Sequence, residues 1–118
     1  MGKSSGVRIN FNFNQCEVIH KEGLERAVRL ALSESGMEVR AFVVDEFPDD
    51  NTATVIFALA ESHGGLGSYS DDCHVAGDIT VCHYRCDNTA KARIYVEVLE
   101  RELRPKKADI VEDQWEAL

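Results

Sequence analysis

Hydrophobic and polar residues alternate without a break from residue 7 to residue 14, in the order Val-Arg-Ile-Asn-Phe-Asn-Phe-Asn. A period of two is typical of a strand that buries one face and leaves the other outside the core. Other apolar runs are rich in β-branched and aromatic residues and are bounded by turn residues. They predict strands over residues 37–47, 53–60, 74–84 and 108–111.

Two further segments carry apolar residues at helical spacing. The first covers residues 21–35 and ends before Gly36, a residue type that is common just past a helix end. Its apolar stripe consists of Leu24, Ala27, Val28, Ala31 and Leu32. The second covers residues 89–103, and Pro105 prevents its continuation. The polar, glycine-rich stretch from Glu61 to Cys73 predicts a loop.

The predicted order of elements is β-α-β-β-β-α-β, which gives an antiparallel or mixed sheet with both helices on one face. The fold class is therefore α+β, a two-layer sandwich. We expect a single domain over residues 7–112. A flexible leader at residues 1–6 precedes it, and a loose acidic tail at residues 113–118 follows it.

The formal net charge of -8 argues against a nucleic-acid partner, because such proteins need a basic face. The acidity is compatible with a cationic small substrate, although solubility alone explains it as well. The longest apolar run, residues 54–60, is too short to cross a membrane. No apolar stretch of a secretory signal is visible near the N-terminus, so we expect a cytoplasmic protein with reduced cysteines.

The apolar run stops abruptly at Glu61-Ser62-His63 and continues into Gly64-Gly65. A serine between an acid and an imidazole, at the mouth of a strand, is where backbone or acyl chemistry is expected. A hydrolase triad is disfavoured because the Gly-x-Ser-x-Gly elbow is absent. Adjacent serine and histidine side chains also rarely point at each other from an extended backbone.

Cys73, His74, His83 and Cys86 are of metal-ligand types, but their spacing is not that of a zinc knuckle. A continuous strand between them would hold Cys73 and His83 about 30 Å apart. We therefore expect no metal site.

The Glu-Ser segment and a later motif together resemble one family, the small prokaryotic S-adenosylmethionine decarboxylase proenzymes. In that family a Glu-Ser bond after a hydrophobic strand cuts itself. Some twenty residues later an Asp-x-x-x-Cys motif follows, which Asp78-Ile79-Thr80-Val81-Cys82 supplies here. The resemblance covers roughly residues 7–112 and includes Cys16 after the first strand and the Arg-Pro-Lys-Lys-Ala exit from the second helix.

The resemblance implies a self-cleaving decarboxylase of polyamine and spermidine biosynthesis. The Ser62 hydroxyl would attack the carbonyl of Glu61, and elimination at Ser62 would leave a pyruvoyl cofactor on the new N-terminus. That ketone would form a Schiff base with the substrate amine and withdraw electrons as carbon dioxide leaves. Cys82 matches the family's proton donor, and Thr54 matches a hydroxyl that assists processing.

The resemblance also implies substrate contacts and an assembly. Asp71 matches an acid that contacts the ribose, and Phe47 matches a ring that stacks on adenine once a residue is inserted in the following turn. In the family the sheet of one copy packs on a second copy, with the sites near that interface. We therefore expect at least a homodimer.

The chain departs from the family at the position of a catalytic histidine, where it has Gly67. His63, His74 and His83 are the imidazoles that could replace it. Tyr69-Ser70-Asp71 also stands in place of a Trp-Pro-Glu-like segment.

Three functions stay open. The chain could process itself and decarboxylate S-adenosylmethionine. It could process itself but act on a basic amino acid such as ornithine or arginine, drawn by the adjacent Asp71 and Asp72. Or it could remain uncut and serve as a binding or regulatory module.

Overall fold

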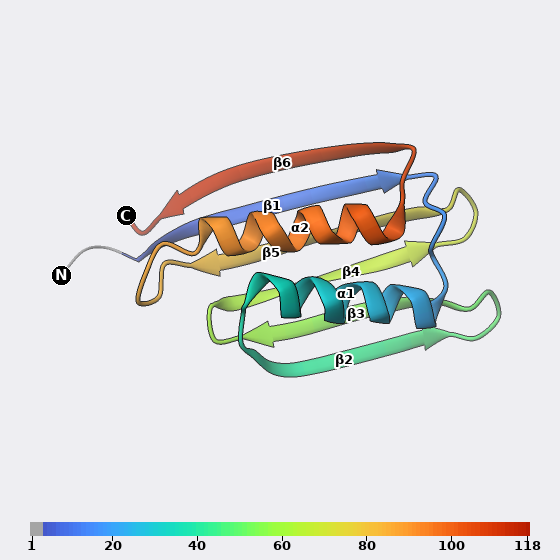
Figure 1. Ribbon diagram of the computed structural model, residues 1–118, viewed down its shortest axis with the longest axis horizontal. Helices are drawn as coiled ribbons and strands as arrows, with labels where there is room; N and C mark the ends of the chain where they lie inside the picture. Colours follow the sequence, from blue (N-terminus) through green and yellow to red (C-terminus); the bar gives the residue numbers. More distant parts are fainter. Residues whose placement is uncertain (1–3) are drawn as a thin grey trace.

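The structure of the chain is a computed structural model that describes residues 4–118. Six strands and two helices follow one another along it (Figure 1). They are β1 (Ser5–Asn14), α1 (Lys21–Ser35), β2 (Val39–Phe47), β3 (Thr52–Leu59), β4 (Ser62–Tyr69), β5 (His74–Cys82), α2 (Thr89–Leu103) and β6 (Lys107–Glu116). The strands form one sheet in the order β2-β3-β4-β5-β1-β6, and every neighbouring pair is antiparallel.

Both helices lie against the same face of this sheet (Figure 1). The predicted two-layer α+β sandwich is therefore confirmed. The bounds of both helices also agree with those predicted from the apolar spacing. α1 ends at Gly36, whose φ of 75° is a left-handed conformation that a residue without a side chain adopts at little cost.

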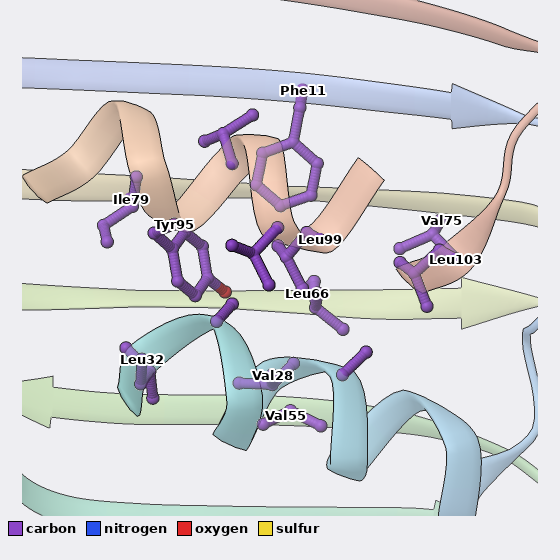
Figure 2. Packing of buried hydrophobic residues seen from close by; sticks show 14 of the residues in the cluster. Phe11, Val28, Leu32, Val55, Leu66, Val75, Ile79, Tyr95, Leu99 and Leu103 are labelled. Carbon is purple, nitrogen blue, oxygen red and sulfur yellow. The ribbon is translucent and has the colours of Figure 1, made fainter. Parts of the chain in front are cut away.

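The core lies between the helices and the sheet. The four apolar residues of the alternating β1 pattern are at most 2 % exposed, and so are the five of the α1 stripe. α2 contributes Ala92, Tyr95, Val96, Val98, Leu99 and Leu103. Figure 2 shows Tyr95 and Leu99 of α2 packed with Val28 and Leu32 of α1 over apolar side chains of the sheet.

One strand, β4, was predicted to be a loop because of its three glycines. In the sheet these glycines let neighbouring groups approach closely. A Cβ on Gly64 would lie 2.8 Å from the ring of Phe57, and one on Gly65 would lie 2.7 Å from the carbonyl oxygen of Val55. Glycine here therefore reflects tight packing between β3 and β5 and not a flexible segment.

The predicted boundaries at both chain ends also need correction. β6 runs to Glu116, so most of the acidic tail expected at residues 113–118 is a strand paired with β1. Ser5 and Gly6, placed in the flexible leader, begin β1; residues 1–3 of that leader lie outside the described residues. β6 is an edge strand whose polar side chains stay exposed, and its sequence therefore lacks the apolar alternation that marks a strand.

The sheet face opposite the helices, called the open face here, is covered by no other element of the described chain (Figure 1). Side chains on a strand alternate between faces, so the residues that alternate with the core positions point to this side. Several of them are large apolar side chains that are about half exposed or more. They include Val43, Phe47, Ile56, Tyr69 and Val111.

Tyr95 provides a test of the core. Its side chain is fully buried, and its hydroxyl has no hydrogen-bond partner in the described structure. Burial raises the pKa of Tyr95, so the hydroxyl stays protonated. Tyr95→Phe should raise the free energy of unfolding by about 1 kcal/mol, because it removes an unsatisfied polar group. Urea unfolding would measure this, with Tyr84→Phe at an exposed position as the neutral control.

Candidate active site

The Glu61–Ser62 peptide lies where β4 begins, beside the end of β5. The carbonyl oxygen of Glu61 accepts a hydrogen bond of 2.8 Å from the backbone N–H of Cys82. Ser62 has a φ of 155°, a positive value that side-chain-bearing residues rarely adopt. The peptide bond of interest is thus both held by a donor and followed by an unusual backbone conformation.

The hydroxyl of Ser62 lies 3.1 Å from Nδ1 of His63. This corrects the expectation that adjacent serine and histidine side chains do not meet. That expectation assumed a regular extended backbone, and the positive φ of Ser62 departs from it. His63 is exposed and Ser62 is half-buried, so a proton taken from the serine by the imidazole can pass to solvent.

The side chain of Glu61, like its carbonyl oxygen, has polar partners. The residue is 9 % exposed, and its Oε1 accepts a 3.1 Å hydrogen bond from the backbone N–H of Glu38, which precedes β2. Its Oε2 lies 3.9 Å from Nζ of Lys91 in the first turn of α2. The residue before the candidate bond is therefore anchored on both sides.

Strand register places four predicted residues at one end of the sheet, called the cleavage end here. Ser62 pairs with Val81, the neighbour of Cys82, and His63 pairs with Thr80 on the open face. The cleavage end consists of Glu61, Ser62, His63 and Cys82.

The other three predicted residues lie together at the opposite end of the strands. Phe47, Thr54 and Asp71 line one pocket of about 370 Å³, together with Asp50, Thr52, Ser68, Tyr69 and Ser70. Asp50 accepts hydrogen bonds from the hydroxyls of Thr52 (2.6 Å) and Ser70 (2.8 Å), which lower the pKa of its carboxyl group. We call this the Phe47–Asp71 pocket.

The two groups do not meet within one chain. Thr54 pairs with Gly67, which follows Ser62 by five positions along β4. At about 3.3 Å per residue this is a separation of roughly 16 Å. The sequence grouped Ser62 with Thr54 as one site, but a single copy holds them apart.

Gly67 leaves space that two hydroxyl groups border. A Cβ built on it would lie 3.5 Å from the hydroxyl oxygen of Tyr69 and 3.6 Å from Oγ1 of Thr54. Sequence reasoning missed Tyr69 because it assigned this segment to a loop. Once β4 is a strand, alternation puts positions 67 and 69 on the same face.

Two of the three candidate imidazoles have other partners. Nε2 of His74 lies 3.0 Å from Oδ1 of Asn12, and its ring meets the Tyr69 ring edge-on at 6.1 Å. Nδ1 of His83 accepts a 3.2 Å hydrogen bond from the backbone N–H of Asn88. Only His63 lies beside Ser62.

Other kinds of site find no support in the part of the chain that the structure covers. Among residues 4–118, no three His, Cys, Asp or Glu side chains are grouped so that they could hold a metal ion. Neither helix in that range is long and apolar enough to cross a membrane.

Comparison with known proteins agrees with this fold. A sequence model of the family described as S-adenosylmethionine decarboxylase matches residues 9–114. The fold is similar to the crystal structure of the adenosylmethionine decarboxylase from Aquifex aeolicus VF5, with a TM-score of 0.82 and 18% identity over 94% of this chain and 90% of that one. No curated protein matches the sequence. Since the family match spans most of its length, the chain belongs to the S-adenosylmethionine decarboxylase family.

Proposed function

We propose that the chain is a self-cleaving, pyruvoyl-dependent decarboxylase that acts on S-adenosylmethionine in cytoplasmic polyamine biosynthesis. The hydrogen bond from the Cys82 N–H to the Glu61 carbonyl carries the proposal. It polarises the carbonyl that the Ser62 hydroxyl must attack. The family membership supports decarboxylation as the reaction.

In the first step, the Ser62 hydroxyl oxygen attacks the carbonyl carbon of Glu61. His63, 3.1 Å away in the tautomer with a bare Nδ1, accepts the hydroxyl proton and returns it to the departing amide nitrogen. The Cys82 N–H stabilises the negative charge that builds on the carbonyl oxygen. The C–N bond breaks, and an ester links the Glu61 carbonyl to the Ser62 oxygen.

In the second step, a base removes the Cα proton of Ser62, and the bond between Cβ of Ser62 and the ester oxygen breaks. Residues up to Glu61 leave as a carboxylate. The dehydroalanine left at position 62 takes up water and loses ammonia, which yields a pyruvoyl group on the chain that begins there. That N-terminus would start β4, beside Cys82, so the residues present fit the group.

The pyruvoyl ketone supplies an electron sink for the loss of carbon dioxide from an amino acid. The thiol of Cys82 then gives a proton to the carbon that lost the carboxylate. Cys82 is half-buried at the end of β5, next to Val81, the residue that pairs with Ser62. Asp71 and Phe47 bind the ribose and adenine of the substrate.

A homodimer completes the site, since one copy holds its two halves roughly 16 Å apart. Two open faces packed together about a two-fold axis that crosses the strands near Gly65 would set each cleavage end against the other copy's Phe47–Asp71 pocket. The exposed Val43, Ile56 and Val111 would be buried in that interface. Thr54 of one copy then assists cleavage of the other.

A basic amino acid such as ornithine or arginine is the second candidate substrate, supported by the carboxylates of Asp50 and Asp71 in the pocket. A non-processing binding module is the alternative to any enzyme, supported by the absence of an imidazole at Gly67. The state of the Glu61–Ser62 bond in purified protein separates the enzyme from the binding module.

Intact-protein mass spectrometry tests the cleavage. The wild-type protein should give two fragments that meet at Ser62, the second with a pyruvoyl N-terminus, and Ser62→Ala should give one uncut, inactive chain. Cys82→Ala should still cut, because alanine keeps the backbone N–H, but lose about 100-fold or more in kcat with its proton donor. An uncut wild-type chain, or a fully active Ser62→Ala protein, would contradict the proposal.

Co-expression tests the shared site. Thr54→Ala alone should cut about 100-fold more slowly than wild type, because it lacks the assisting hydroxyl. When Thr54→Ala is paired with Ser62→Ala, the Thr54→Ala chain should be cut at a near-normal rate, since its partner supplies Thr54. If pairing brings no recovery while the wild-type protein cuts, each copy works with its own residues.

Tyr69 is proposed as the hydroxyl that, beside Thr54, takes the place left open by Gly67. Tyr69→Phe keeps the ring that contacts His74 and removes only the hydroxyl. It should slow cleavage by about 100-fold, and adding Gly67→His should restore part of the rate. Tyr84→Phe, at an exposed tyrosine, is the matched control. Equal cleavage rates for Tyr69→Phe and wild type would exclude this role.

A further inference from the structure

The start of α2 lies at the cleavage end, beside the places where β5 ends and β4 begins (Figure 1). Asn88, the residue directly before the helix, is of a type that normally caps a helix with its own side chain. Here the side chain makes no cap hydrogen bond to α2. Its Nδ2 instead donates to the carbonyl oxygens of Cys82 (2.8 Å) and Tyr84 (3.4 Å). Asn88 therefore holds the end of β5 against the start of α2.

The hydrogen bonds of Asn88 are shielded from water, because the residue is only 1 % exposed. Its backbone N–H also donates to Nδ1 of His83, the residue after Cys82. Cys82 is thereby held through its carbonyl oxygen, while its own N–H donates to the carbonyl oxygen of Glu61. A buried hydrogen-bonded network fixes the positions of its members. The donor that polarises the Glu61 carbonyl thus takes its position from Asn88.

Lys91, in the first turn of α2, contacts the side chain of Glu61. Its Nζ lies 3.9 Å from Oε2 of Glu61, and the two side chains are 36 % and 12 % exposed. The pair of Arg93 and Glu112 on the same helix is more exposed, at 57 % and 26 %. Charges interact more strongly where less water surrounds them. The Glu61 carboxylate belongs to the residue whose carbonyl gains negative charge during the attack, and the Lys91 ammonium offsets the resulting repulsion.

We infer that the start of α2 positions the Glu61–Ser62 bond for self-cleavage, with Asn88 acting through Cys82 and Lys91 acting through Glu61. Both are positioning residues, since each acts through a neighbour of the reacting atoms. The positive φ of Ser62 is an unfavourable conformation that persists only where the surroundings hold it. Contacts to the carbonyl and to the side chain of Glu61 provide that support. The inference rests on the proposed function, because that function makes this bond the one that is cut.

Cell-free translation of the full chain, with the cut fraction followed by gel electrophoresis, measures the cleavage rate. Lys91→Met should slow cleavage about tenfold. In a Glu61→Gln chain the same change should slow it less than about twofold, because Lys91 acts through the carboxylate charge that this chain lacks. Lys91→Arg keeps a positive charge and should restore most of the rate. Arg93→Met is the matched control, since it removes a closer ion pair of α2, at 2.7 Å, and should leave the rate unchanged.

Asn88→Ala should slow cleavage about tenfold and should also lower the kcat of the cut protein, because Asn88 holds the residue that supplies both the N–H and the thiol. Thermal unfolding identifies the variants that are folded at the assay temperature.

Three results would overturn the inference and leave the proposed function standing. The first is a wild-type rate in Lys91→Met while the wild-type chain cuts itself, or in a folded Asn88→Ala chain. The second is an equal effect of Lys91→Met with and without the Glu61 carboxylate. The third is slowing by Arg93→Met as strong as that by Lys91→Met. A wild-type chain that never cuts would refute the proposed function, and this inference with it.

Discussion

β4 is held between β3 and β5 by backbone hydrogen bonds on both of its edges, and its glycines make that close packing possible. The pairing brings the Glu61 carbonyl to the Cys82 N–H, which defines the cleavage end. It also brings Gly67 beside Thr54 at the other end. A slip of one residue in this register would turn every side chain of β4 to the opposite face and separate both groups.

Two glycines of the open face show the same relation to an aromatic residue. At Gly67 the hydroxyl of Tyr69 borders the free space, and at Gly6 the indole of Trp115 fills it. In each case the strand has no side chain at the glycine. The aromatic group over the free space comes from two positions along the same strand at Gly67, and from the neighbouring strand at Gly6. Each of these two glycines is thus bordered by an aromatic side chain on the face where the chemistry is proposed.

The division of the site follows from the geometry of a sheet. Strands extend about 3.3 Å per residue, so residues on one strand are near one another only at short spacing. Ser62 and Thr54 belong to opposite ends, and no side chain spans the distance between them. Placing a second open face on the first, as in the proposed homodimer, would bring the two ends together.

The sequence by itself determined both helices, because their apolar spacing and the Gly36 stop are local signals. It also determined the core face of β1, and it predicts chemistry at the Glu61-Ser62-His63 segment. Only the tertiary structure decided that the glycine-rich segment is a strand, that residues 112–116 complete β6, and that Trp115 lies over Gly6 and Tyr69 beside Gly67. These features depend on which strands lie side by side, and contacts between residues distant in the chain leave no periodic trace in it.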